Sequence, residues 1–135
     1  MTAGSVVLDA SVLIRSAVVS EPAAREWVRA VEAGDVEGHV PEVAYAETVS
    51  GLAKYIRADL LDPKLASEIL EGVVQLPLFT HGHGRLAIAS LVLALELGLS
   101  AYDASYLALA QSLDVPLVTA DRRLADLAPR SELLP

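Results

Sequence analysis

Hydrophobic positions along this 135-residue chain fall into two kinds of segment that follow one another: short apolar runs and longer stretches with helical spacing. Strands that alternate with helices in this way indicate βαβ units and a parallel sheet covered on both faces. The short runs predict β-strands at residues 6–8, 38–40, 73–78 and 117–119, with residues 132–134 as a candidate edge strand. The longer stretches predict helices at residues 11–19, 22–33, 41–58, 63–71, 83–97 and 99–113, and a last helix that begins near Asp121.

The stretch 99–113, LSAYDASYLALAQSL, is apolar on almost every side of a helix, which is typical of a buried helix. Asp103 nevertheless lies in its first turn, where an isolated carboxylate is costly to bury unless a charged or hydrogen-bonding group meets it. One interpretation is local: Ser100 caps the helix, and Asp103 completes a capping-box-like pair and complements the helix dipole. The other interpretation is a functional site that this turn faces.

Three more acidic residues occupy positions that fit such a site. Asp9 directly follows the first predicted strand, Asp121 follows the predicted strand near the C-terminus, and Glu47 lies in the second turn of the helix opened by Pro41. In open α/β sheets, ligands bind beyond the carboxyl ends of the strands. We therefore expect Asp9, Asp103 and Asp121 to face the same edge of the sheet.

Each of these acids also has a structural interpretation. Asp9 and Asp121 are credible helix N-caps, although Ser11 is an alternative N-cap that lowers the need for Asp9. Glu47 lies off the main apolar stripe of its helix, where a solvated glutamate is the default. The small residues beside it, a serine and a glycine, would however let another backbone or an ion approach.

Four acidic side chains near one sheet edge repel one another strongly unless a cation neutralises them. The chain has no cysteine and no compelling pattern of histidines, so oxygen ligands remain, and these suit Mg²⁺ or Mn²⁺ rather than zinc. A site of this kind supports hydrolysis of a phosphodiester by metal-activated water.

The amino-acid composition limits the classes of protein to which this chain can belong. A hydrophobic content of 53% and a charged content of 21% describe one compact domain, which we expect to span residues 1–135. The sequence shows no signal peptide and no convincing membrane span, so we expect a soluble, cytoplasmic protein. The net charge of −8 argues against a general nucleic-acid coat, but it leaves a nuclease open, because a metal-filled acidic site attracts phosphate.

The motifs VVLDASVLI, LSAYDASYLALA and PLVTADRRLA, with Glu47 between the first two, resemble the PIN-domain family, most closely the VapC-type toxins of prokaryotic toxin–antitoxin pairs. The resemblance covers essentially the whole chain. It implies a three-layer α/β/α sandwich with a mostly parallel central sheet. It also implies a metal-dependent endoribonuclease that acts on RNA, is silenced by a cognate antitoxin protein, and forms a homodimer.

The resemblance further implies the role of individual residues. Asp9 and Asp103 would be the principal ligands of the metal, and the other two acids would complete its shell or orient the attacking water. Ser11 and Thr119 match hydroxyl positions that support the site in the family. The acids that resemble the family's metal-binding quartet are Asp9, Glu47, Asp103 and Asp121.

Other classes of protein fit less well. The principal alternative is a PIN-like module that binds RNA or a protein without cutting. A signalling receiver domain would need an aspartate at the end of the third strand and a lysine after the last one, and the chain has neither. A metal phosphatase of small substrates would need a nucleophile motif such as D-x-D, where this chain reads DAS.

The remaining chemistry-bearing residues have ordinary interpretations. His81 and His83 could bind a metal, but nothing nearby supplies a third ligand, and a flexible loop is the default. Trp27 fits the buried side of an amphipathic helix, with a partner contact as the alternative. Three arginines are either RNA-phosphate contacts or solvated helix surface: Arg15, Arg122 and Arg123.

Overall fold

A five-stranded parallel sheet lies at the centre of the computed structural model, which describes residues 4–135. Neighbouring strands follow the order β3-β2-β1-β4-β5, and every neighbouring pair is parallel. Because β1 and β4 are adjacent, the two segments that follow them begin side by side. The strands are β1 (Ser5–Leu8), β2 (Glu37–Pro41), β3 (Phe79–His81), β4 (Leu117–Thr119) and β5 (Ser131–Leu133).

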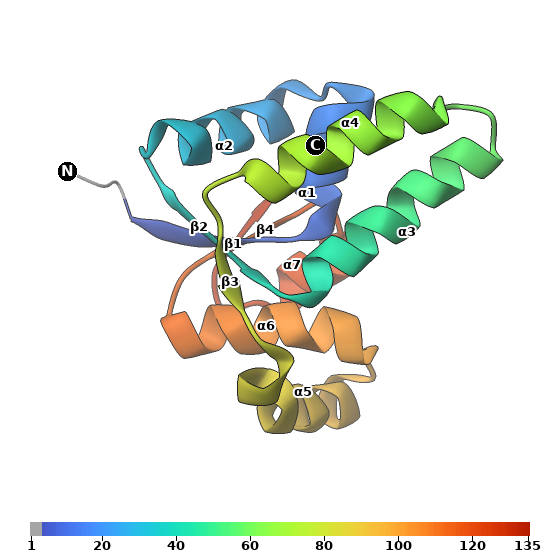
Figure 1. Ribbon diagram of the computed structural model, residues 1–135. Coiled ribbons are helices and arrows are strands. Elements are labelled where there is room, and N and C mark those ends of the chain that lie inside the picture. The colour runs from blue at the N-terminus through green and yellow to red at the C-terminus, as the bar shows by residue number, and fades with distance from the viewer. Residues whose placement is uncertain (1–3) are drawn as a thin grey trace.

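Helices cover both faces of this sheet. The first four lie on one face, and α5 and α6 lie on the other (Figure 1). The expected three-layer α/β/α sandwich is thereby confirmed. The helices are α1 (Ala10–Ile14), α2 (Pro22–Ala33), α3 (Val43–Arg57), α4 (Pro63–Gln75), α5 (His83–Leu97), α6 (Ala101–Leu113) and α7 (Arg122–Leu127), and a π-helical segment, η1 (Arg15–Val19), follows α1.

The position of α6 explains why its sequence is apolar, because neighbouring elements enclose the helix on both sides. It packs against the strands on one side and against α5 on the other (Figure 1). All residues from 104 to 110 are buried, and Tyr106 and Leu107 are fully inaccessible to solvent. The Ser100 hydroxyl caps the helix by accepting a hydrogen bond from the Asp103 amide at 3.1 Å, as the sequence predicts.

The predicted strand at residues 73–78 is wrong. Helix α4 continues to Gln75, and the strand β3 begins only at Phe79. Ala66 and Val73, two helical turns apart, are both buried, so helical spacing extends into the apolar run that we interpreted as a strand. The helix then ends at Leu76, whose backbone is extended, as expected for a residue that precedes a proline.

Two helix starts also differ from the prediction. Pro41 ends β2 instead of opening a helix, and α3 begins at Val43. The helix predicted at 11–19 begins one residue earlier, because Asp9 rather than Ser11 is its N-cap. Its second half is the π-helical segment, which stops at Ser20 in the left-handed conformation, with φ of 54°.

Within residues 4–135, no single helix is long and apolar enough to cross a membrane. Helices α5 and α6 reach that length and composition only together, and they are bent by 114° at the break between them.

The burial of α6 predicts the effect of a substitution in it. We expect Leu107→Ala to lower the free energy of unfolding by about 2–5 kcal/mol, because it removes a fully buried side chain and leaves a cavity. Urea unfolding followed by circular dichroism measures this change. Leu60→Ala is the matched control, because Leu60 is 70% exposed, and it should change the free energy by less than about 0.5 kcal/mol. Equal effects of the two substitutions would contradict the enclosed position of α6.

Candidate active site

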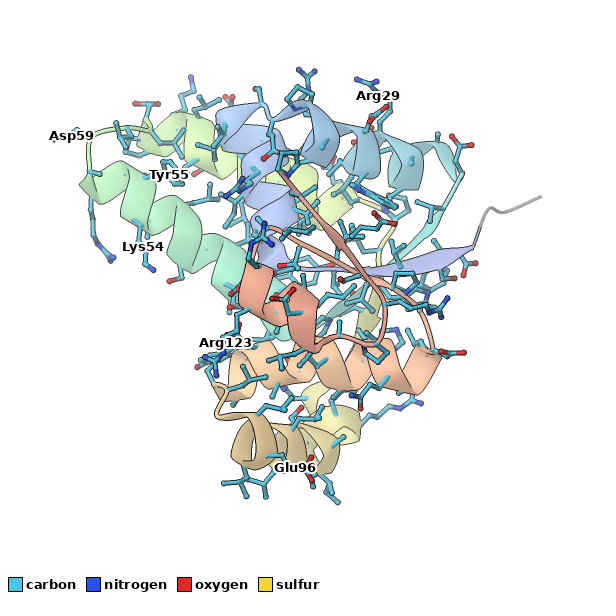
Figure 2. All side chains as sticks on the ribbon, turned by 180° about the vertical axis from the view of Figure 1, so that it is seen from behind. Arg29, Lys54, Tyr55, Asp59, Glu96 and Arg123 are labelled. Atoms are coloured by element: carbon cyan, nitrogen blue, oxygen red, sulfur yellow. The ribbon has the colours of Figure 1, made fainter. Side chains whose placement is uncertain are left out.

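All four predicted acids line one cavity of about 490 Å³ at the carboxyl ends of β1 and β4. Asp9 and Asp121 follow these two strands, whereas Glu47 and Asp103 reach the cavity from α3 and from the first turn of α6. Of the described residues that line the cavity, Lys54 of α3 alone is basic. Figure 2 shows Lys54 projecting from α3 on the same side of the molecule as Arg123.

Asp9 is held in place by the two hydroxyl residues expected to support the site. Its Oδ2 atom accepts hydrogen bonds from Thr119 Oγ1 at 2.6 Å and from Ser11 Oγ at 3.1 Å. Each hydroxyl oxygen also accepts a backbone N–H from the loop after β4: Ser11 from Ala120 at 3.1 Å, and Thr119 from Asp121 at 3.0 Å. The network therefore fixes the ends of β1 and β4 relative to each other.

The Asp121 carboxylate takes part in helix capping, whereas the Asp103 carboxylate does not. Asp121 is the N-cap of α7, and its Oδ1 atom accepts a hydrogen bond from the Leu124 amide at 3.2 Å. At the start of α6, Ser100 already acts as the cap. No hydrogen bond to the Asp103 carboxylate is found within residues 4–135. Helix capping thus accounts for part of the role of Asp121, but not for the Asp103 side chain.

Glu47 is half-buried, in contrast to the solvated position that its helical spacing suggested by default. Its Oε1 atom is buried without a hydrogen-bond partner among the described residues. The buried Tyr106 hydroxyl, which accepts the Ala10 amide at 3.4 Å, is near enough to lower the pKa of Glu47 by hydrogen bonding. Gly51, one turn further along α3, packs on the Ile14 side chain where a Cβ atom would clash, so glycine allows α3 and α1 to approach closely.

Burial and neighbouring negative charges raise the pKa values of three carboxylates in the cavity. Burial is the largest cause for Asp9, opposed by its hydrogen bonds to Thr119 and Ser11, and the pKa is raised overall. The pKa of Glu47 is raised by burial and by the charges of Asp9 and Asp103, against the effect of Tyr106. Burial, followed by the charges of Asp9 and Asp121, also raises the pKa of Asp103. Negative charge in this cavity is therefore unfavourable without a proton or a cation.

The cavity fits a hydrated divalent cation. The Oε1 atom of Glu47 and the carboxylate of Asp103 are without hydrogen-bond partners among the described residues, so their oxygen atoms are available to an ion. Within residues 4–135, no three His, Asp or Glu side chains already lie close enough together to enclose an ion. Mg²⁺ does not require such a cage, because it keeps several waters and takes only one or two carboxylates directly.

Sequence reasoning missed two residues of the site. Lys54 lies seven residues after Glu47, so the two share one face of α3, and this spacing was the available signal. Tyr106 lies three residues after Asp103, but an apolar helix offers no sign that its tyrosine hydroxyl faces an acid.

The histidines lie outside this cavity. His81 belongs to β3 rather than to a loop, and its Nε2 atom lies 2.9 Å from Nδ1 of His39 on β2, in a hydrogen bond between neighbouring strands. His83 begins α5. The structure thus gives His39 and His81 a structural role at the edge of the sheet.

Two of the candidate arginines are bound to the protein itself. Arg15 forms an ion pair with Glu21 at 3.0 Å. Arg123 donates to the carbonyl oxygens of Leu97 and Gly98 at 3.0 and 3.2 Å, at the end of α5.

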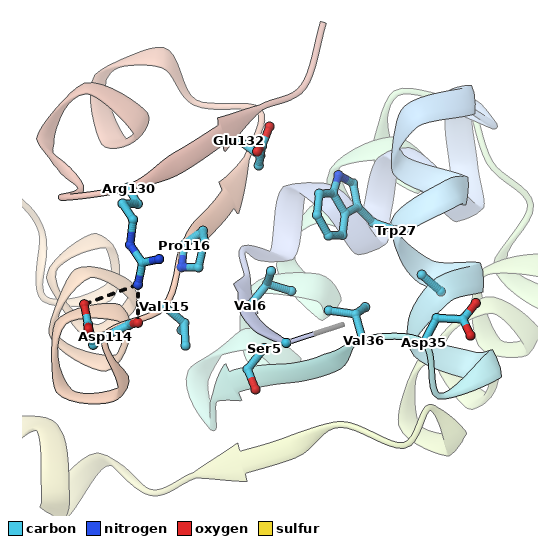
Figure 3. Close-up of a pocket in the computed structure, with 12 residues that line it drawn as sticks. Ser5, Val6, Trp27, Asp35, Val36, Asp114, Val115, Pro116, Arg130 and Glu132 are labelled. Atoms are coloured by element: carbon cyan, nitrogen blue, oxygen red, sulfur yellow. Dashed lines mark hydrogen bonds and ion pairs between the residues drawn. The ribbon is translucent and has the colours of Figure 1, made fainter. Parts of the chain in front are cut away.

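A second cavity, of about 570 Å³, contains none of the predicted site residues (Figure 3). It lies near the amino ends of β1 and β4, and Trp27 of α2 forms part of its wall while packing on the core. Asp114 and Arg130 pair with each other beside it at 3.2 Å, so their charges are already matched.

Comparison with known proteins places this chain in a family. The sequence model of the PIN domain matches residues 6–129. The chain belongs to the PIN-domain family. Ribonuclease VapC3 of Pyrobaculum aerophilum is 34% identical over 125 residues, which cover 91% of this chain and 94% of that protein. Ribonuclease VapC9 of Mycobacterium tuberculosis is 32% identical over 121 residues, which cover 90% of this chain and 89% of that protein.

Solved structures agree with this assignment. The crystal structure of PAE2754 from Pyrobaculum aerophilum superposes with a TM-score of 0.75 at 27% identity, covering 95% of this chain and 89% of the other. VapBC2 from Rickettsia felis, bound to a DNA fragment of its promoter, superposes with a TM-score of 0.74 over 97% of this chain and 99% of the other. At 12% identity, that second likeness shows the fold alone.

The raised pKa values predict how pH changes the stability of the metal-free protein. A carboxyl group with a raised pKa binds its proton more tightly in the folded state, so its contribution to the free energy of unfolding falls as the pH rises. We expect Asp103→Asn, which removes the charge, to have a higher melting temperature than wild type at pH 8 in chelator. The difference should shrink towards pH 5, and Mg²⁺ should stabilise the variant less than wild type.

Scanning calorimetry at several pH values measures these differences. Asp126→Asn is the control, because Asp126 is an exposed carboxylate of α7 outside the cavity. It should follow wild type both in its pH dependence and in its response to Mg²⁺. If the two asparagine variants behave alike, the electrostatic description of the cavity is wrong.

Proposed function

We propose that this protein is an endoribonuclease that uses Mg²⁺ or Mn²⁺ to hydrolyse phosphodiester bonds in RNA. The observation that carries the proposal is the cavity at the ends of β1 and β4, where four carboxylates meet and where burial and neighbouring negative charges raise the pKa values of Asp9, Glu47 and Asp103. The names of the relatives support it, because two proteins at 32–34% identity over about nine-tenths of this chain are ribonucleases.

In this proposal, Asp9 and Asp103 hold the metal ion, and Glu47 and Asp121 complete the site or orient the attacking water. When bound, the ion supplies a Lewis acid that activates water and stabilises negative charge on the phosphate. The hydrogen bonds from Thr119 and Ser11 fix the Asp9 carboxylate before any ligand arrives. The unpartnered Oε1 atom of Glu47 is free to accept a proton or a hydrogen bond from water.

Lys54 is the proposed contact for the RNA phosphate. It is the basic side chain among the described residues that line the acidic cavity, and it is exposed. Ser50 and Gly51 line the cavity between Lys54 and Glu47. Both residues are small, so they leave space for the RNA backbone to enter. An ammonium group here would offset part of the repulsion between phosphate and a protein of net charge −8.

The proposed partners are RNA as the substrate, a cognate antitoxin protein as the inhibitor, and a second copy of the chain in a homodimer. The antitoxin is supported by the likeness of the fold to VapBC2 and to a toxin–antitoxin complex from Klebsiella pneumoniae. The proposed compartment is the cytoplasm, where RNA and a coexpressed inhibitor would both be present.

Cleavage of a labelled RNA pool tests the proposed activity. We expect wild type to cut with Mg²⁺ or Mn²⁺ and not with chelator, and Asp103→Asn to lose more than roughly 100-fold in rate, because it keeps the shape of the side chain but removes a ligand charge. Asp126→Asn should cut like wild type. Equal cutting by wild type and Asp103→Asn would overturn the proposal. Metal binding without cutting would instead favour a PIN-like module that binds RNA or protein without catalysis.

A second experiment tests the role of Lys54. We expect Lys54→Ala to raise KM for RNA about tenfold across different sequences, and to lower the slope of log KM against log salt by about 1, because one phosphate contact is lost. Lys64→Ala on α4 removes an exposed lysine that does not line the cavity, and it should leave both quantities unchanged. An unchanged salt slope in Lys54→Ala would show that Lys54 does not contact phosphate.

A further inference from the structure

Tyr102 is an exposed aromatic residue at the edge of the acidic cavity. It lies in the first turn of α6, directly before Asp103, and is 55% exposed. Among the described residues that line this cavity, it is the only aromatic one. Tyr106, one turn further along the same helix, is by contrast fully buried and belongs to the hydrophobic core. Helix α6 thus holds one tyrosine inside the protein and one beside the site.

The Tyr102 ring has no packing partner within residues 4–135. It is not among the hydrophobic residues of this part of the chain that pack on the core, and its hydroxyl forms no hydrogen bond there. Phe79, the other described aromatic residue that is at least half exposed, differs in this respect, since its ring stacks on His39 at a centroid distance of 4.9 Å. The ring of Tyr102 is therefore available to a ligand.

The acidic cavity extends along α3, away from the carboxylates. Its α3 wall runs from Val43 to Lys54, a separation of eleven residues, or about 16 Å along the helix axis. Glu47 lies near one end of this wall and the lysine at the other. A volume of about 490 Å³ is that of a small-molecule pocket, so the cavity fits nucleotides of one strand better than a double helix.

The walls of the cavity offer different chemistry to such a strand. Lys54 on α3 presents a positive charge, which suits phosphate, whereas Tyr102 on α6 presents an uncharged aromatic face, which suits a base. Tyr102 and Asp103 are consecutive, so their Cα atoms lie about 3.8 Å apart and their side chains diverge by about 100° around the helix. A nucleotide whose phosphate is held at Asp103 would have its base within reach of the neighbouring ring.

We propose that Tyr102 is a base-stacking residue, which holds the base of a nucleotide at the cleavage position against its ring. The inference rests on the proposed function and deepens it, because the residues assigned so far act on the metal ion or on phosphate. Every base has a π-face, so a tyrosine ring stacks on all four. Stacking would therefore orient the nucleotide without specifying its sequence.

The first turn of α6 is a firm support for this ring. Ser100 accepts the Asp103 amide at 3.1 Å, and the Ser105 hydroxyl donates to the main-chain carbonyl oxygen of Tyr102 at 2.6 Å. Arg123, which Figure 2 shows beside this end of α6, donates to the last carbonyl oxygens of α5 at 3.0 and 3.2 Å. A tyrosine side chain has few rotatable bonds, so little conformational entropy is lost when it binds a base.

Photochemical cross-linking tests the contact itself. A single-stranded RNA that carries iodouracil is irradiated with the full chain in Ca²⁺, a cation that also takes oxygen ligands. Iodouracil attaches preferentially to an aromatic ring stacked on it, and mass spectrometry locates the attached residue. We expect attachment at Tyr102 and its loss in Tyr102→Leu. Attachment at another residue would overturn the proposal.

Fluorescence anisotropy in Ca²⁺ tests the contribution of the contact to affinity. We expect Tyr102→Leu to raise the Kd for a uracil-only RNA strand about tenfold, because a base–aromatic stack is worth about 5-fold to 100-fold. Tyr102→Phe keeps the ring and should stay within about twofold of wild type. Phe79→Leu is the matched control, because Phe79 is 50% exposed outside the cavity, and it should leave the Kd unchanged.

An abasic strand of the same length separates stacking from phosphate contacts. It keeps every phosphate, so wild type should bind it about tenfold more weakly than the uracil strand, whereas Tyr102→Leu should bind both strands alike. An abasic penalty that persists in Tyr102→Leu, or a Tyr102→Phe variant as weak as Tyr102→Leu, would overturn the stacking role. Weaker binding accompanied by a lower melting temperature would assign Tyr102 a structural role instead.

The outcomes also separate this inference from the proposed cleavage. A protein that binds RNA through Tyr102 but does not cut it with Mg²⁺ or Mn²⁺ would keep the stacking residue and overturn the nuclease. Cleavage that is unaffected in Tyr102→Leu, together with unchanged binding, would keep the nuclease and overturn the stacking residue. A wild type that binds neither RNA strand would overturn both.

Discussion

The hydrogen bond from Thr119 Oγ1 to Asp9 Oδ2, at 2.6 Å, is the contact on which the geometry of the site depends. Main-chain pairing sets β1 beside β4, and the Asp9 amide extends that pairing by donating to the Val118 carbonyl oxygen at 3.0 Å. Beyond this point the chains diverge, and the side chains of Thr119 and Ser11 take over the connection. A buried carboxylate with several donors is strongly positioned, so the other acids meet at a fixed reference point.

The second constraint is the burial of α6 between the sheet and α5. Because residues 104–110 of this helix are buried on every side, it cannot turn or slide without opening the core, so its first turn is held at the carboxyl edge of the sheet. Ser100 satisfies the free amide of Asp103, and the carboxylate is left for the cavity. Local capping and a functional role for Asp103 are therefore compatible, because one residue caps the helix and the other faces the site.

The sequence predicted those features that local physical chemistry determines. Alternating apolar runs and helical segments sufficed for the layered fold, and the position after a parallel strand sufficed to bring Asp9 and Asp121 together. The prediction failed at residues 73–78, where β-branched residues end a helix whose buried face was already set by Ala66. It understated the burial of Glu47, because this burial comes from packing of α3 close to α1, where Gly51 lies against the Ile14 side chain, and from neighbours on other elements. The residue spacing and composition of one helix do not predict how closely it packs on another helix.

The acidic cavity explains how a protein of net charge −8 can act on a polyanion. The pKa values of Asp9, Glu47 and Asp103 are raised first by burial and then by neighbouring carboxylates, so their negative charges are unfavourable in the folded state. In the proposed function, a divalent cation would offset part of that repulsion and would present a positive charge to the phosphate, so the acids that repel one another in the empty site would hold the group that attracts the substrate. Lys54, which lines the same cavity from α3, would add a second positive charge. In that proposal, stability and substrate binding would both respond to one event, the neutralisation of the carboxylates at the ends of β1 and β4.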